Sequence, residues 1–377
     1  MNPFRALVLA GLAAFAPHAA RADIHVGVTL PLTGPGAALG LPARNALSMW
    51  PQEIAGQKVV LDIVDDGGDA ATATKNARRF AQDKVDVILG SANTPSSLAV
   101  NQVVNEVKVV QLSPSPVELP EGRDAWTFRA AMHAAYYAEA VVDHMKKAGI
   151  KTVGFLGVSD AYGESCLQAF TKYAQQAGIK VAPVERFTRA DTSVAAQALK
   201  LVASQPQAVY VVAIGGGAAL PQKALAERGY KGKVYHTAAS VSPDFLRVAG
   251  KDAEGAIVVS GPEQVPEQLP ATYPSRQIAL NFVEQYEGKF GAGSRTQFAA
   301  HIYDFGLLLQ SIVPVALKKA TPGTPEFRVA LKDALENSAG IPVTKGSVKY
   351  TSADHWGHGP DARVMLVVQG GQWKLLN

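Results

Sequence analysis

The sequence predicts an α/β protein built as two doubly wound lobes with parallel sheets. Short runs rich in Val, Ile and Leu alternate with longer segments whose apolar residues recur at helical spacing. Strands with near-continuous apolar residues, separated by helices, are typical of parallel sheets that are buried on both faces. The alternation begins at Ile24 and restarts after Ala131, which indicates two similar lobes.

The first part of the chain supplies enough elements for one complete sheet with helices around it. Gly, Pro, Asp or Ser residues bound its apolar runs, as expected where strands give way to loops. We expect strands at 24–30, 58–64, 85–90 and 107–113, and helices at 42–54, 71–83 and 95–107.

The second part repeats this order, and several of its helices end in Gly just before the next strand. We expect helices at 134–149, 162–178, 194–204 and 219–229, and strands at 151–157, 180–187, 208–214 and 233–237. After an apolar run at 254–261, the pattern predicts helices at 277–291, 297–320 and 325–337 and strands at 346–351 and 362–368. The pattern alone does not assign these last elements to a lobe.

The N-terminus predicts a secretory signal peptide at residues 1–22. One Arg precedes an apolar stretch too short to span a bilayer, and an Ala-Arg-Ala cleavage site ends at Ala22. No later segment has enough uninterrupted apolar residues to cross a membrane. We therefore expect a protein that is exported to the periplasm and is not inserted in the membrane.

Composition excludes several classes of function. Removal of Arg5 and Arg21 with the signal leaves 34 basic and 32 acidic residues, and the basic residues are scattered, so no nucleic-acid partner is expected. The single cysteine, Cys166, indicates a fold without disulfides and is interpreted as a buried, inert thiol.

No cofactor, metal or enzymatic reaction is predicted. The Gly-rich segments lack the spacing of phosphate-binding loops. His355 and His358 are interpreted as parts of a structural loop, and the Asp residues between 62 and 69 as the end of a strand and the start of a helix. No Ser-His-Asp or Cys-His arrangement stands out.

Four segments together resemble one family: GVTLPLTGPGAALGLPARNAL from Gly27, DDGGDAATATKNARRF from Asp65, DAYGES from Asp160 and SADHWGHGPDARVMLV from Ser352. They are similar to the branched-chain amino acid binding proteins of ABC importers, which are type I periplasmic binding proteins. The resemblance implies two lobes joined by three hinge crossings, with lobe 1 formed by 23–126 plus 258–340 and lobe 2 by 127–257 plus 341–377. It also implies a small ligand between the lobes and a membrane permease as partner.

The resemblance places the ligand carboxylate against the first lobe. Parallel sheets bind ligands at the carboxyl ends of their strands, and the first helix after Leu89 offers unpaired N–H groups there. The residues expected to bind, directly or through the backbone, are Asn93, Thr94, Ser96, Ser113, Pro114 and Ser115. Capping of the helix is the alternative role for Asn93, Thr94 and Ser96.

In the second lobe, the resemblance implies that Tyr162 closes over the ligand. The family's ammonium-binding carboxylate is missing, because Ala238 or Ala239 stands at its position, and Ile214 and Gly215 occupy the neighbouring one. Burying an ammonium without a counter-charge costs several kcal/mol. His133, Tyr136 and His236 complete the expected site, with helix capping as the alternative for His133.

We therefore expect a monomeric solute-binding protein for an aromatic or other apolar carboxylic acid without an amino group. A binder of branched-chain or other aliphatic amino acids is the alternative ligand class. A ligand-sensing domain and a secreted hydrolase are the alternative kinds of protein.

Overall fold

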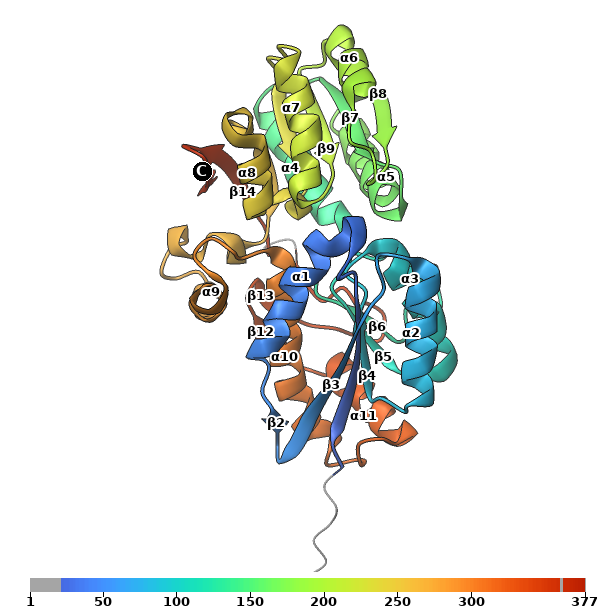
Figure 1. Cartoon of the computed structure of the whole chain (residues 1–377). Helices are drawn as coiled ribbons and strands as arrows, with labels where there is room; N and C mark the ends of the chain where they lie inside the picture. The colour runs from blue at the N-terminus through green and yellow to red at the C-terminus, as the bar shows by residue number, and fades with distance from the viewer. Residues whose placement is uncertain (1–21, 360–361, 377) are drawn as a thin grey trace, which may run out of the picture.

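Residues 22–359 and 362–376 are described by a computed structural model, and they form two lobes, one above the other in Figure 1. The signal peptide predicted at 1–22 lies outside the described residues, apart from Ala22. The predicted α/β class with two parallel-sheet lobes is confirmed.

The first lobe holds a six-stranded sheet in the order β2-β3-β1-β4-β5-β6. Its strands are β1 (Ile24–Leu30), β2 (Glu53–Ile54), β3 (Gln57–Asp65), β4 (Val87–Gly90), β5 (Val110–Ser113) and β6 (Thr127–Arg129). All pairs are parallel except β2 with β3. Helices α1 (Ala37–Ala46), α10 (Gln297–Ala316) and α11 (Pro325–Glu336) pack together on one side, and α2 (Ala70–Gln82) packs on α3 (Thr94–Val107) on the other. Helices cover both sides of the central strands, so β1 and β4 are almost entirely buried, whereas β3, nearer the edge, carries polar residues and is only partly buried.

The second lobe holds a seven-stranded sheet in the order β15-β14-β11-β10-β9-β7-β8. Its strands are β7 (Thr152–Val158), β8 (Lys180–Phe187), β9 (Ala208–Val212), β10 (Lys233–His236), β11 (Ile257–Ser260), β14 (Val364–Gln369) and β15 (Gln372–Leu375). Strands β7 to β11 are parallel, whereas β14 and β15 add an antiparallel edge. Helix α4 (Ala134–Lys147) packs on α5 (Ala161–Gln176), and α7 (Ala219–Glu227) packs between α6 (Ala195–Ser204) and α8 (Pro243–Ala249).

The chain crosses between the lobes three times: after β6, after β11, and between β13 and β14. The lobe boundaries differ by a few residues from those expected at 126/127 and 257/258. Strand β6 pairs within the first sheet, so the first lobe extends to Arg129, and β11 belongs to the second sheet through Ser260. Strands β12 (Ile341–Val343) and β13 (Gly346–Val348) form a separate hairpin against α10 and α9 (Arg276–Phe290), outside the second-lobe sheet. The sequence predicted a strand at 346–351, which includes β13, but it missed β12, because three residues give too short an apolar pattern to be recognised.

Helix α1 begins at Ala37, five residues before the predicted start at Pro42. Proline is favoured as the first residue of a helix, but Pro42 lies inside this one. The C-terminal part of the same prediction, 42–54, includes the short strand β2. Proline inside a helix removes one hydrogen bond, and the packing of α1 on α10 outweighs that local preference.

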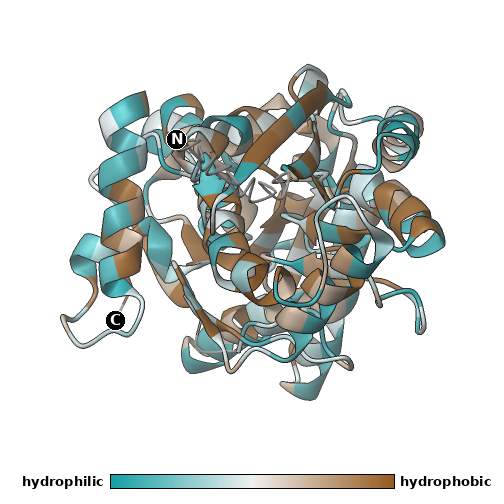
Figure 2. Ribbon diagram, turned by 90° about the horizontal axis from the view of Figure 1, so that it is seen from below, coloured by the Kyte–Doolittle hydropathy of each residue, from teal (hydrophilic) through white to brown (hydrophobic). Residues whose placement is uncertain are grey.

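One described helix, α10, is long and apolar enough to span a bilayer by length and composition, contrary to the expectation from the sequence. However, 67% of its most apolar window is buried inside the protein, as in the core helix of a globular lobe. Figure 2 shows hydrophobic colour gathered on the strands at the centre of the molecule and hydrophilic colour toward its periphery.

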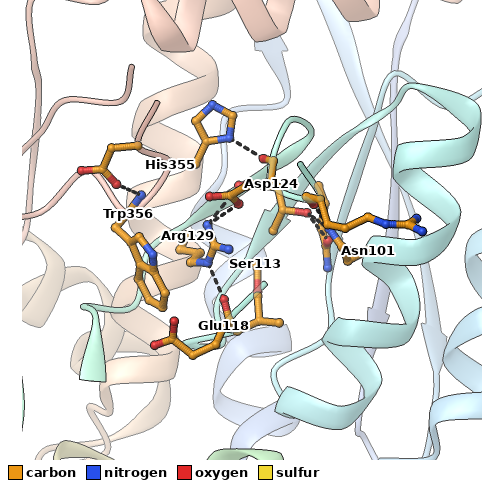
Figure 3. Close-up of polar contacts among 12 residues, drawn as sticks. Asn101, Ser113, Glu118, Asp124, Arg129, His355 and Trp356 are labelled. Atoms are coloured by element: carbon orange, nitrogen blue, oxygen red, sulfur yellow. Dashed lines mark hydrogen bonds and ion pairs between the residues drawn. The ribbon is translucent and has the colours of Figure 1, made fainter. Parts of the chain in front are cut away.

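A buried arginine at the end of β6 ties the first crossing to the third. Arg129 is 1% exposed, its Nε donates to the Val117 carbonyl at 2.7 Å, and its Nη1 pairs with Asp124 at 2.8 Å. The guanidinium lies 4.4 Å from the ring centre of Trp356, which belongs to the third crossing (Figure 3). Charge pairing and stacking together offset the cost of burying this cation.

A second buried cation, Lys345, joins groups from all three crossings. Its Nζ donates to the Ala130 carbonyl of the first crossing at 3.1 Å and to Nε2 of His301 at 2.5 Å. His358 of the third crossing donates to the same carbonyl at 3.1 Å. Burial lowers the pKa of Lys345, whereas the charges of Glu263, on the second crossing, and of Asp304 oppose this shift.

We expect Lys345→Met to destabilise the protein by on the order of 3 kcal/mol, because it leaves buried acceptors and carboxyl groups without their cation. Lys349→Met, at an exposed position four residues later, is the matched control and should change stability little. Urea unfolding followed by fluorescence measures both. Equal stability of the two variants would contradict a structural role for the Lys345 ammonium.

Candidate functional site

A cavity of about 580 Å³ lies between the two lobes. It forms where loops leave the carboxyl ends of the strands, as expected for facing parallel sheets. The first lobe contributes Leu39, Ala92, Thr94, Pro114, Pro116, Gln297, Phe298 and His301, the first crossing and the start of α4 contribute Ala131, Met132 and Ala134, and the second lobe contributes Tyr137, Tyr162, Cys166, Arg189, Tyr210, Ile214, Thr237, Ala238 and Ala239.

Five residues predicted from the sequence line this cavity together. They are Thr94, Pro114, Tyr162, Ile214 and Ala238. Each follows the carboxyl end of a strand, which brings residues far apart in sequence to one place.

Ser113 and Ser115 do not line the cavity but lie behind it. Ser115 Oγ is hydrogen-bonded to Thr94 Oγ1 at 2.7 Å, and Ser113 Oγ to Ser97 Oγ at 2.8 Å. All four residues are buried. The serines therefore fix the start of α3 and orient the Thr94 hydroxyl, instead of facing the cavity themselves.

Asn93 and Ser96 also lie outside the cavity lining. Asn93 precedes α3, and its Nδ2 donates to the Gly68 carbonyl at 3.1 Å, which ties the helix to the loop after β3. The Ser96 hydroxyl is buried and has no hydrogen-bond partner among residues 22–359 and 362–376.

His133 and Tyr136 take structural positions at the start of α4. His133 Nδ1 accepts from the Ala135 N–H at 3.0 Å, so this side chain caps the helix, the alternative that the sequence left open. The Tyr136 ring lies against His133, and it is the next residue, Tyr137, that lines the cavity. Adjacent helical residues point about 100° apart, so of these two tyrosines, both of which the sequence offered as ring contacts, Tyr137 faces the cavity.

His236 and Gly215 also lie outside the cavity lining. His236 is fully buried, its Nε2 donates to Gln222 Oε1 at 2.8 Å, and its ring meets Phe245. Burial lowers the pKa of His236 to about 3, so the ring is neutral. Gly215 lines a neighbouring interlobe cavity of about 910 Å³.

The sequence interpretation missed several residues of the lining. Gln297, Phe298 and His301 come from the start of α10, which the second crossing returns to the first lobe. Cys166 lies one turn after Tyr162 on α5, and burial raises the pKa of its thiol to about 12, which agrees with the expected inert cysteine. Arg189, two residues beyond β8, has the pattern of an ordinary surface charge in the sequence.

Arg189 is the one charged side chain in the lining formed by the described residues, and no Asp or Glu joins it. Its Nε donates to Asp160 Oδ2 at 2.6 Å. The other basic group, His301, donates from Nδ1 to the Pro114 carbonyl at 2.8 Å and accepts at Nε2 from Lys345. Burial lowers the pKa of His301 well below its usual value, so its ring is neutral, and the Arg189 guanidinium, paired with Asp160, is the cationic group of the described lining.

Within the part of the chain that the structure describes, no group of three or more His, Cys, Asp or Glu residues could hold a metal ion. His355 donates to the Asp124 carbonyl at 2.7 Å and contacts Glu336, and its ring stacks on Phe128. Asp69 caps α2 by accepting from Thr72. These are the structural roles that the sequence predicted for both motifs.

Comparison with known proteins gives one consistent result. A family described as "Periplasmic binding protein" matches residues 23–372. The Leu/Ile/Val-binding protein homolog 1 of Brucella melitensis is 24% identical over 97% of this chain and 99% of its own length. An extracellular ligand-binding receptor from Rhodopseudomonas palustris is 42% identical, with a TM-score of 0.93 over 95% of this chain and 100% of that chain. A solute-binding protein of the same organism, solved with benzoate, is 20% identical with a TM-score of 0.78 over 94% and 95% of the two chains, a similarity of fold.

The buried neutral histidines predict an acid-sensitive fold. An unfolded histidine takes up a proton near pH 6.5, whereas burial lowers the pKa of folded His236 and His358 to about 3. Stability is therefore lost as the pH falls from about 6.5 toward 3, by up to about 1.4 kcal/mol per pH unit for each histidine. His236→Gln should remove the contribution of one histidine from the pH dependence of the unfolding free energy. Urea unfolding at several pH values measures this change.

His25→Gln, at an exposed position of β1, is the control for that experiment. It should leave the wild-type pH dependence of the unfolding free energy in place. A His236→Gln variant with the full wild-type pH dependence would show that the buried ring does not resist protonation.

Proposed function

The chain belongs to the periplasmic binding protein family, and from that premise we propose that it binds an aromatic or other apolar carboxylic acid without an amino group. The ligand occupies the interlobe cavity, and the loaded protein delivers it to the membrane permease of an ABC importer. The protein acts in the periplasm as a monomer and returns its ligand unchanged.

The charge of the cavity lining carries this proposal. A zwitterionic amino acid needs a partner for its ammonium, yet none of the described residues that line the cavity is Asp or Glu. A closed cleft without that partner disfavours the ammonium by several kcal/mol. The Arg189 guanidinium lines the cavity, and while its Nε pairs with Asp160, its Nη groups offer charged donors to an anion.

The walls of the cavity suit a flat, apolar body. Tyr137, Tyr162, Tyr210 and Phe298 contribute aromatic rings, and the remaining lining is mostly aliphatic. The Tyr162 hydroxyl donates to Thr237 at 2.8 Å, which fixes its ring at the cavity wall.

On the first-lobe side, Thr94 provides the polar contact. Its hydroxyl is held by Ser115, and α3 begins at this residue, so the Thr94 hydroxyl and the first N–H groups of the helix are available to a polar group. Among the residues predicted from sequence, we propose ligand contact for Thr94, Pro114, Tyr162, Ile214 and Ala238.

Binding of branched-chain amino acids is the second candidate, because relatives are named Leu/Ile/Val-binding proteins. Isothermal titration of the purified chain separates the two. The decisive pair is 3-phenylpropanoate and L-phenylalanine, which differ only in the ammonium group. We expect 3-phenylpropanoate to bind at least tenfold more tightly than either L-phenylalanine or leucine. Tighter binding of either amino acid would overturn the proposal.

A variant that fills the cavity tests its location. Ala238 is 2% exposed and lines the cavity, so Ala238→Phe should lower the affinity for 3-phenylpropanoate by at least tenfold through occupied volume. Ala203→Phe places the same ring at an exposed position of α6 and should leave the affinity within threefold. Unfolding temperatures without ligand confirm that both variants fold, and unchanged affinity in Ala238→Phe would place the ligand elsewhere.

A further inference from the structure

We propose that Arg189 of the second lobe, instead of the start of α3 in the first, binds the ligand carboxylate and determines specificity for acids. This inference rests on the proposed function, since it assigns one end of the carboxylic acid within the same cavity. It reverses the orientation expected from the sequence, in which neutral hydroxyl groups of the first lobe hold the anion.

The position of Arg189 is fixed by the start of α5. Asp160 accepts hydrogen bonds from the N–H groups of Tyr162 at 2.9 Å and Gly163 at 3.1 Å through Oδ1, and thus caps the helix. Its other oxygen, Oδ2, accepts from Arg189 Nε at 2.6 Å. The Asp160 carboxylate therefore has two roles: it caps α5, and it holds the Arg189 guanidinium beside Tyr162 at the cavity. The Arg189 side chain is only 18% exposed.

The hydrogen bonds of Arg189 leave its outer donors unused. Among the described residues, neither Nη1 nor Nη2 of Arg189 has a hydrogen-bond partner, and the single bond through Nε anchors the group. A guanidinium edge with free N–H groups matches the two oxygens of a carboxylate in a bidentate pair.

A second arginine in the same loop region shows the contrasting arrangement. Arg186 also pairs with an acidic residue in the first turn of α5, Glu164, but it uses both Nε at 2.5 Å and Nη2 at 3.0 Å. Its side chain is 42% exposed and does not line the cavity. Arg186 is therefore engaged through two groups in a surface pair outside the cavity, whereas Arg189 keeps both of its Nη groups for a ligand at the cavity.

The start of α3 is a weaker carboxylate site than the sequence suggested. The Thr94 hydroxyl is already hydrogen-bonded to Ser115, Pro95 has no N–H, and the Ser97 N–H donates to the Asn93 carbonyl at 2.8 Å. The remaining donors are few and neutral. They therefore favour a carboxylate over a neutral amide less than a guanidinium does, since a guanidinium adds its own charge and a bidentate fork.

The test compares an acid with its neutral amide, 3-phenylpropanoate and 3-phenylpropanamide, by isothermal titration. Wild-type protein should prefer the acid by at least 30-fold. Arg189→Gln should lower acid affinity by about 30-fold or more, as for loss of one partner of a buried charge pair, and change amide affinity by less than threefold. The preference for the acid then falls close to one. Arg186→Gln is the matched control and should keep both the affinity and the preference within threefold.

Two further variants keep the inference falsifiable if Arg189→Gln does not fold. Arg189→Lys retains the charge without the bidentate fork and should reduce the preference for the acid partially. Thr94→Val should weaken acid and amide by the same factor. The inference is overturned if Thr94→Val abolishes the preference for the acid over the amide, or if the folded Arg189 variants keep that preference. In either case the proposed function is still supported as long as the wild-type protein binds the acid. A wild-type protein that binds neither ligand overturns the proposed function itself.

Discussion

The relation between the two lobes depends on the burial of one ammonium group, that of Lys345. A cation that is removed from water must be surrounded by acceptors and opposite charge, and here these come from separate parts of the chain. The groups near Lys345 come from segments that lie far apart in the sequence. They are the Ala130 carbonyl, the Glu263 carboxyl and the His301 ring. The Lys345 ammonium therefore couples the first crossing to α10, and separation of the two would leave a buried ammonium without one of its acceptors.

The same network reaches the cavity through His301. Because Lys345 donates to Nε2, the ring must carry its proton on Nδ1, which donates to the Pro114 carbonyl. Pro114 and His301 both line the cavity. The position of one cavity wall and the geometry of the first crossing are thus parts of one hydrogen-bonded chain.

The sequence predicted well those features that the strand pattern determines. Thr94, Tyr162, Ile214 and Ala238 each come after a strand, and parallel sheets bring such residues to one edge. It predicted less where side-chain direction decides, as between Tyr136 and Tyr137, or where a hydroxyl finds a nearer partner, as in Ser113 and Ser115. Gln297 and His301 were out of reach, because only the path of the second crossing brings α10 beside residues almost two hundred positions earlier. Arg189 was missed because an arginine after a strand looks like any surface charge until its loop is placed.

Under the proposed function, selectivity for an anion over a zwitterion is a difference between two binding free energies, and we trace both sides of that difference to the second lobe. Where a carboxylate would accept an ammonium, the chain has Ala238 and Ala239, so a zwitterion loses its partner. Where the cavity meets the loop after β8, Arg189 adds a cation that attracts a carboxylate and repels an ammonium near it. The first lobe contributes neutral contacts, which recognise polarity and shape but not charge.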